Sequence, residues 1–92
     1  VGVIHRHDFG LGAALVDALR EPNDVVVGDN LPLQIQDDGD VTIPRHGERR
    51  RLPNVLIEVR QDTLATASAR EIWAARLYAA LGRALCTLSS RA

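Results

Sequence analysis

The chain has no lysine, no methionine, one cysteine and only three aromatic residues among its 92 residues. The lone cysteine, Cys86, excludes an internal disulfide and fits a reducing compartment such as the cytoplasm. No apolar run reaches the roughly eighteen residues that a membrane helix needs. The few aromatics, Phe9, Trp73 and Tyr78, offer little on which nucleic-acid bases could stack. The composition therefore favours a protein without membrane or nucleic-acid partners.

The charges nearly cancel, since eleven basic residues, all of them arginine, stand against twelve acidic ones. Such a chain has no overall field that attracts a polyanion or a membrane surface. Its 46% hydrophobic content is enough for one small domain, but 92 residues are few for a complete α/β enzyme. Val1 opens an apolar run with no methionine before it. We therefore expect residues 1–92 to be the C-terminal portion of a larger single domain.

Short apolar runs separated by amphipathic segments predict an α/β fold. The expected strands lie at 1–4, 25–27 and 55–60, and the expected helices at 9–20 and from 68 onwards. The branched apolar residues at 55–57 do not alternate with polar ones, which indicates a strand covered on both faces, and the run at 1–4 is expected to be a buried strand. Pro22 ends the first helix, and Ser68 and Glu71 have the spacing of a capping box at the start of the second.

The chain between residues 42 and 62 joins a loop of ionisable groups to a strand that ends on a carboxylate, Glu58. Because side chains alternate along a strand, Leu56, Glu58 and Arg60 are expected to share one face. Ligands of open α/β sheets bind beside the carboxyl ends of strands. A carboxylate partly withdrawn from water there is a stronger proton acceptor, as a general base must be. A structural ion pair of Glu58 with Arg60 or Arg45 fits the same pattern equally well.

Two other stretches contain groups that bind metal ions in other proteins. His5 and His7 share a face after the first strand, so a metal site that includes Asp8 is conceivable. Asp8 has a simpler use as the cap of the following helix, which we favour. The aspartates at 37–40 lack the spacing of a calcium-binding EF-hand loop, and a solvated loop is the better interpretation.

A basic cluster between Arg45 and Arg51 suggests a second class of function. It contains four arginines and His46, and Glu48 reduces its net positive charge. Such a loop suits a non-enzymatic module that binds an anion or an acidic partner. Binding to a phosphate backbone is disfavoured, because the chain lacks the aromatic side chains and the extended basic face that this usually needs.

Several motifs taken together resemble the C-terminal part of the N-formylglutamate amidohydrolase family. They are Gly28-Asp29-Asn30 with Pro32, Arg45-His46, Leu52-Pro53, and the run Ile57-Glu58-Val59-Arg60-Gln61-Asp62. The run from Glu58 preceded by His46 is the specific part, and the rest of the chain is compatible with the family. The resemblance implies a fold similar to that of zinc-dependent carboxypeptidases, a mixed sheet flanked by helices. It also implies hydrolysis of N-formyl-L-glutamate, an intermediate of histidine breakdown, to formate and glutamate.

The same resemblance implies a zinc ion held by two histidines and a glutamate upstream of this chain. None of these ligands is expected within the 92 residues. Glu58 is implied as the general base and acid, which takes a proton from the attacking water and passes it to the departing amine. Arg45, His46 and Arg60 are candidates for binding the substrate carboxylates and the oxyanion, and Asn30 is a candidate donor from a nearby loop.

The sequence departs from the family pattern at two positions. Leu33 stands where tyrosine is common, which removes one polar contact with the substrate. Arg51 stands where a glycine is usual before Leu52 and Pro53. Another N-acyl amino acid is therefore an alternative substrate.

Overall fold

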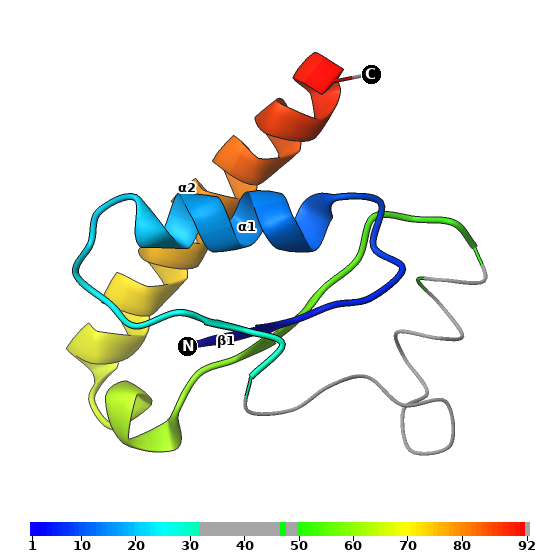
Figure 1. The fold of residues 1–92 in the computed structure, drawn as a ribbon. Helices are drawn as coiled ribbons and strands as arrows, with labels where there is room; N and C mark the ends of the chain where they lie inside the picture. Colours follow the sequence, from blue (N-terminus) through cyan, green and yellow to red (C-terminus); the bar gives the residue numbers. More distant parts are fainter. Residues whose placement is uncertain (32–46, 48–49, 92) are drawn as a thin grey trace, which may run out of the picture.

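The structure is a computed structural model that describes residues 1–31, 47 and 50–91. In this part of the chain, three short strands form one mixed sheet (Figure 1). The central strand, β1 (Gly2–Ile4), lies between β2 (Gly28–Asp29) and β3 (Leu56–Glu58). It pairs in parallel with β2 and antiparallel with β3. The expected α/β class and the mixed sheet are therefore confirmed.

Helix α1 (Leu11–Arg20) lies against one face of the sheet (Figure 1). Its apolar stripe recurs at helical spacing, and Leu15 and Leu19 are almost completely buried. Val3 and Ile57 are opposite each other on β1 and β3 and belong to the same hydrophobic cluster. Burying a leucine side chain contributes about 2 kcal/mol, so this cluster is the main source of stability.

Helix α1 begins at Leu11, two residues later than the sequence pattern predicts. Phe9 and Gly10 have φ values of 58° and 90°, in the left-handed region that a right-handed helix does not contain. The Asp8 carbonyl accepts a hydrogen bond from Leu11 N at 3.2 Å, and the Asp8 carboxylate accepts one from Gly12 N. The N-cap residue is Gly10, and the predicted role of Asp8 is confirmed in part, because its carboxylate accepts a hydrogen bond from one amide of the first turn.

The second helix, α2 (Ala67–Arg91), follows a short 3₁₀ helix, η2 (Gln61–Leu64), and passes behind α1 (Figure 1). Ala80 and Ala84 are buried in the cluster that α2 shares with α1, and Trp73 is buried nearer the start of α2. Leu85 of the same helix is half exposed. Among the described residues, no helix combines the length and apolar character that crossing a bilayer demands.

Two arginines of α2 fasten it to α1 and to the loop after α1. The Arg76 guanidinium donates two hydrogen bonds of 2.8 Å to the carboxylate of Asp24 and lies 5.1 Å from the ring centre of Trp73. Arg83 pairs with Glu21 at 2.9 Å. A forked arginine–carboxylate pair fixes orientation as well as distance, so these contacts set the angle at which α2 crosses α1.

Strand β2 begins three residues later than predicted, at Gly28 rather than Val25. Its ladder is fixed by β1, because Gly28 N donates to Val1 O and Asn30 N donates to Val3 O, each at 2.8 Å. Val26, the central residue of the predicted strand, is 88% exposed. The prediction from apolar residues alone therefore put the strand in the wrong place, because the register of its pairing with β1 decides where the strand lies.

The prediction that β3 is covered on both faces is wrong for the described residues. Ile57 and the preceding Val55 pack against the hydrophobic cluster, whereas Leu56 is 37% exposed. Within that part of the chain, both helices lie on the Val55 and Ile57 side of the strand. Glu58, on the same face as Leu56, therefore points away from the helices.

The cap of α2 provides a first test of this fold. The Thr66 hydroxyl accepts a hydrogen bond of 3.0 Å from Ala69 N, so the residue that caps the helix lies two positions before Ser68, the first residue of the predicted capping box. Thr66→Ala should lower the free energy of unfolding by about 1 kcal/mol, measured by urea denaturation. Ser68→Ala is the matched control and should change it by less than about 0.5 kcal/mol. A larger loss of stability for Ser68→Ala than for Thr66→Ala would show that Ser68 caps the helix, as the predicted capping box requires.

The forked pair between Asp24 and Arg76 predicts a dependence of stability on pH. Hydrogen bonds from Arg76 lower the pKa of Asp24 below its ordinary value of 3.8. The stabilisation is therefore complete above that value and is lost as the pH falls through the lower pKa of the folded state. The melting temperature of the parent chain should exceed that of Asp24→Asn at about pH 6, and the difference should shrink towards about pH 2. Asp17→Asn, an exposed change on α1, controls for the loss of a charge; a constant difference would contradict the pairing.

Candidate functional site

Glu58 is the last residue of β3 and lies in a row of three residues across the sheet. It is opposite Gly2 on β1, and Gly2 is opposite Gly28 on β2. Laterally paired residues of a sheet point to the same face, and two of these three have no side chain. The half-buried Glu58 carboxylate is therefore the only side chain that the row contributes to the face opposite the helices.

A hollow of about 730 Å³ lies over this row. Its described lining is mainly apolar and comprises Val1, Gly2, Val26, Gly28, Leu31, Glu58, Val59 and Arg60. The size is within the range of small-molecule sites, which combine apolar walls with a few polar groups. Its described charged residues are Glu58 and Arg60, and the amino terminus of Val1 adds a positive group that donates a hydrogen bond of 3.1 Å to Val26 O. The carboxylate at the end of β3 thus has space beside it for a small molecule.

The predicted ion pair between Glu58 and Arg60 is wrong. The Arg60 guanidinium instead pairs with the Asp62 carboxylate at 2.9 Å, and both side chains are exposed. The strand ends at Glu58, and Arg60 already precedes η2, so the alternation of a strand does not carry it onto the face of Glu58. Among the described residues, no group makes an ion pair or a hydrogen bond with the Glu58 carboxylate.

Two of the predicted substrate-binding residues, Arg45 and His46, lie outside the described residues. The same holds for Leu33 and for the aspartates at 37–40. Arg51 is described, and its φ of 55° is in the left-handed region that favours glycine. The departure from the family pattern at this position therefore places a side chain where the backbone suits a residue without one.

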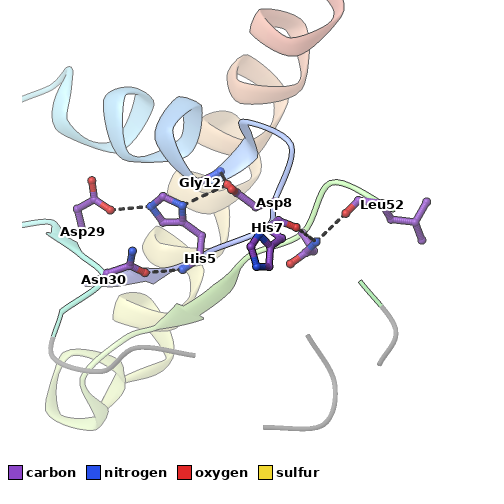
Figure 2. A network of polar contacts seen from close by, with 8 residues as sticks. His5, His7, Asp8, Gly12, Asp29, Asn30 and Leu52 are labelled. Atoms are coloured by element: carbon purple, nitrogen blue, oxygen red, sulfur yellow. Dashed lines mark hydrogen bonds and ion pairs between the residues drawn. The ribbon is translucent and has the colours of Figure 1, made fainter. Parts of the chain in front are cut away.

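At the opposite end of β1, His5 holds together the ends of two strands and the start of α1 (Figure 2). Its Nε2 lies 2.6 Å from Oδ1 of Asp29, and its Nδ1 lies 3.3 Å from Oδ2 of Asp8. The same Asp8 oxygen accepts the hydrogen bond from Gly12 N. We call His5, Asp8, Asp29 and Asn30 the His5 network. Both ring nitrogens of His5 are engaged by carboxylates, so the imidazole is a structural tie.

Asn30 belongs to this network rather than to the hollow beside Glu58. Its Oδ1 accepts a hydrogen bond of 2.7 Å from the backbone nitrogen of His5. The amide oxygen is thus used within the fold, and the NH₂ group is the end that remains to donate to a ligand. Glu58 and Asn30 stand near opposite ends of β1, although Leu31, the next residue, lines the hollow.

The alternative metal site of His5, His7 and Asp8 is not formed. Figure 2 shows the His7 ring pointing away from that of His5, whose nitrogens face Asp8 and Asp29. Within residues 1–31, 47 and 50–91, no three groups of histidine, cysteine, aspartate or glutamate are placed to hold a metal ion. The described residues therefore do not fit a zinc site.

Sequence reasoning missed the two glycines of the row and a link made by Asn54. The Asn54 amide nitrogen donates to His7 O at 3.2 Å and to Leu52 O at 2.6 Å, which joins the loop before β3 to the loop after β1. Glycines inside strands often mark the close approach of a ligand or a backbone, and that signal was present at Gly2. No local signal in the sequence indicated the partner of Asn54.

The His5 network predicts a measurable loss of stability. His5→Leu should lower the free energy of unfolding by roughly 1–3 kcal/mol, because the Asp8 side chain, only 9% exposed, loses its imidazole partner. Urea denaturation measures this change. Asp29→Asn should cost less, because the Asp29 side chain is 46% exposed and water replaces the lost contact. Unchanged stability of His5→Leu would show that the network does not hold the strand ends together.

No family model, curated protein or solved structure matches the chain. The function proposed below therefore rests on the residues of this chain and on the motifs that they form.

Proposed function

We propose that this chain is the C-terminal part of a cytoplasmic, zinc-dependent amidohydrolase with a zinc carboxypeptidase-like fold. Its substrate is an N-acyl amino acid, and the motifs around Glu58 point to N-formyl-L-glutamate. The main support is the position of Glu58, a carboxylate without an ion pair among the described residues, at the carboxyl end of a strand and beside a hollow of suitable size. Groups placed in this way are typical of catalytic acids and bases.

In this proposal Glu58 moves the proton. Its carboxylate accepts a proton from the water that attacks the acyl carbon and then donates it to the nitrogen of the departing amine. The reaction needs this transfer, because an amide nitrogen leaves as an amine only after it has been protonated. An ion pair with Arg60 would occupy the carboxylate, so the observed pairing of Arg60 with Asp62 supports the role.

Arg60 is proposed to bind the carboxylate of the amino acid. Arg60 is among the residues that line the hollow, and its guanidinium forms an ion pair with Asp62 in which both side chains are well exposed. Such exposed pairs contribute about 0–1 kcal/mol, so a substrate carboxylate that accepts two hydrogen bonds can replace Asp62. Arg45 and His46 keep their proposed roles in binding a carboxylate and the oxyanion. Asn30, which belongs to the His5 network and does not line the hollow, is left without a role in this proposal.

The family resemblance assigns zinc to ligands upstream of this chain, and the described residues form no group of three ligands that could hold it. The roles proposed here are accordingly those of the chain's own side chains. They concern the movement of one proton and the binding of the substrate carboxylate.

Glu58→Gln tests the proposal in the protein that joins this chain to its upstream portion. The amide is close in size to the carboxylate but accepts no proton, so kcat for hydrolysis of N-formyl-L-glutamate should fall by about 10²-fold or more. Zinc content and melting temperature should stay unchanged. Glu71→Gln on α2, where the side chain is exposed and outside the hollow, is the matched control. Near-normal turnover by Glu58→Gln would remove this residue from the mechanism.

A further inference from the structure

The partners of the His5 ring indicate which protonation state the structure holds. Nε2 lies 2.6 Å from Oδ1 of Asp29, and Nδ1 lies 3.3 Å from Oδ2 of Asp8 (Figure 2). An ionised carboxylate only accepts hydrogen bonds. A neutral imidazole has one N–H and can donate to one of the two aspartates, whereas an imidazolium donates to both. The geometry is therefore that of a protonated His5.

The surroundings of the ring make this proton matter to the fold. Among the described residues, Asp8 and Asp29 are the charged groups within ion-pair distance of the imidazole. Helix α1 faces the ring with Gly12, where a Cβ atom would overlap the imidazole. The His7 ring points away from it (Figure 2). Protonation of His5 is thus the described source of positive charge between the two carboxylates.

The two aspartates differ in how well water can replace the imidazole. The Asp8 side chain is 9% exposed and also accepts a hydrogen bond from Gly12 N, whereas the Asp29 side chain is 46% exposed. A buried carboxylate that loses a donor pays more than an exposed one, so a single remaining proton is best placed on Nδ1, beside Asp8. The lone pair of Nε2 then faces an Asp29 oxygen, and two acceptors repel each other. Loss of one proton therefore breaks the contact with Asp29.

The contact with Asp29 is one of few that hold the end of β2. This strand has two residues, and its backbone pairs with β1 through Gly28 N and Asn30 N. Asn30 leaves the strand with a φ of 57°, a left-handed conformation that costs energy in a residue with a side chain. Besides the ladder, the end of β2 is held to His5 by the ring contact of Asp29 and by the 2.7 Å hydrogen bond from His5 N to Asn30 Oδ1.

We propose that His5 is a pH-sensitive latch, which fastens the end of β2 while its ring is protonated and releases Asp29 when the proton is lost. Histidine is the side chain whose charge ordinarily changes between about pH 5 and 8, and carboxylates are ordinarily ionised over that range. The contact is therefore present at the acidic end of the range and is lost as the pH rises. Leu31 follows this end of β2 and lines the hollow, so the release also loosens one wall of the hollow. The latch does not depend on the proposed hydrolysis and would operate in an inactive protein as well.

Hydrogen exchange of two amides of β2 tests the latch in the protein that includes the upstream portion. Asn30 N donates to Val3 O next to Asp29, whereas Gly28 N donates to Val1 O at the other end of the strand. Between about pH 5.5 and 8, the protection factor of Asn30 should fall about tenfold or more, the scale of one hydrogen bond to a charged group. That of Gly28 should change by less than about twofold.

Nitrogen-15 NMR of the His5 ring supplies the second readout. The fall in protection of Asn30 should coincide with the change from an imidazolium to a neutral ring that keeps its proton on Nδ1. A protection factor that stays constant while the ring loses its proton would overturn the proposal. A ring that is already neutral at about pH 5.5 would overturn it as well.

Asp29→Asn shows whether the carboxylate causes the effect. A side-chain amide both donates and accepts, so it can pair with either form of the imidazole, and the protection of Asn30 should no longer depend on pH. Asp17→Asn, which removes an exposed charge from α1, is the matched control and should retain the tenfold fall. A fall that survives Asp29→Asn would contradict the latch.

His5→Gln removes the titrating group itself. Glutamine does not change its charge between about pH 5 and 8, so the protection factor of Asn30 should be constant over that range. A fall of the same size in this variant would place the titrating group elsewhere and overturn the proposal.

Discussion

The register of the central strand is the constraint on which both ends of the molecule depend. β1 pairs on each side, so that Gly2 stands between Gly28 and Glu58 in one row. A shift of β3 by one residue would turn every one of its side chains to the other face. Glu58 would then enter the hydrophobic cluster, and Ile57 would leave it. The packing of Val3 and Ile57 in the hydrophobic cluster therefore also fixes the direction of the Glu58 carboxylate.

The carboxylates at the two ends of β1 differ in whether other residues bind them. At its carboxyl end, Asp8 and Asp29 are both engaged by His5, and Asp8 also caps α1. At its amino end, the Glu58 carboxylate stands beside a hollow, and no described residue pairs with it. Carboxylates that are fully used by a fold stabilise it, whereas one without a partner is available for chemistry or for a ligand. This contrast makes Glu58, rather than the His5 network, the better candidate for a reactive group.

Local signals in the sequence were sufficient for part of this arrangement. The spacing of Leu15 and Leu19 predicted the buried stripe of α1, and the position of Asp8 before that helix predicted its cap. The strand that carries Glu58 was also predicted, although it was expected to continue to Arg60 and ends at Glu58. The predictions that failed are those in which two nearby residues could do the same task, such as Ser68 or Thr66 as the cap of α2. Contacts with distant segments decide which residue takes the role, and the sequence of one segment does not reveal those contacts.

Arg60 shows why the site was harder to predict than the fold. The alternation of a strand placed Arg60 beside Glu58, and this holds only while the strand continues. The strand ends at Glu58, and Asp62, two residues after Arg60, is then the nearer carboxylate. Both side chains of this pair are exposed, so the energy that separates the observed partner from another is small. Residues at the ends of strands are where a ligand can exchange partners with the protein at low cost, and for the same reason their contacts are the least determined by sequence.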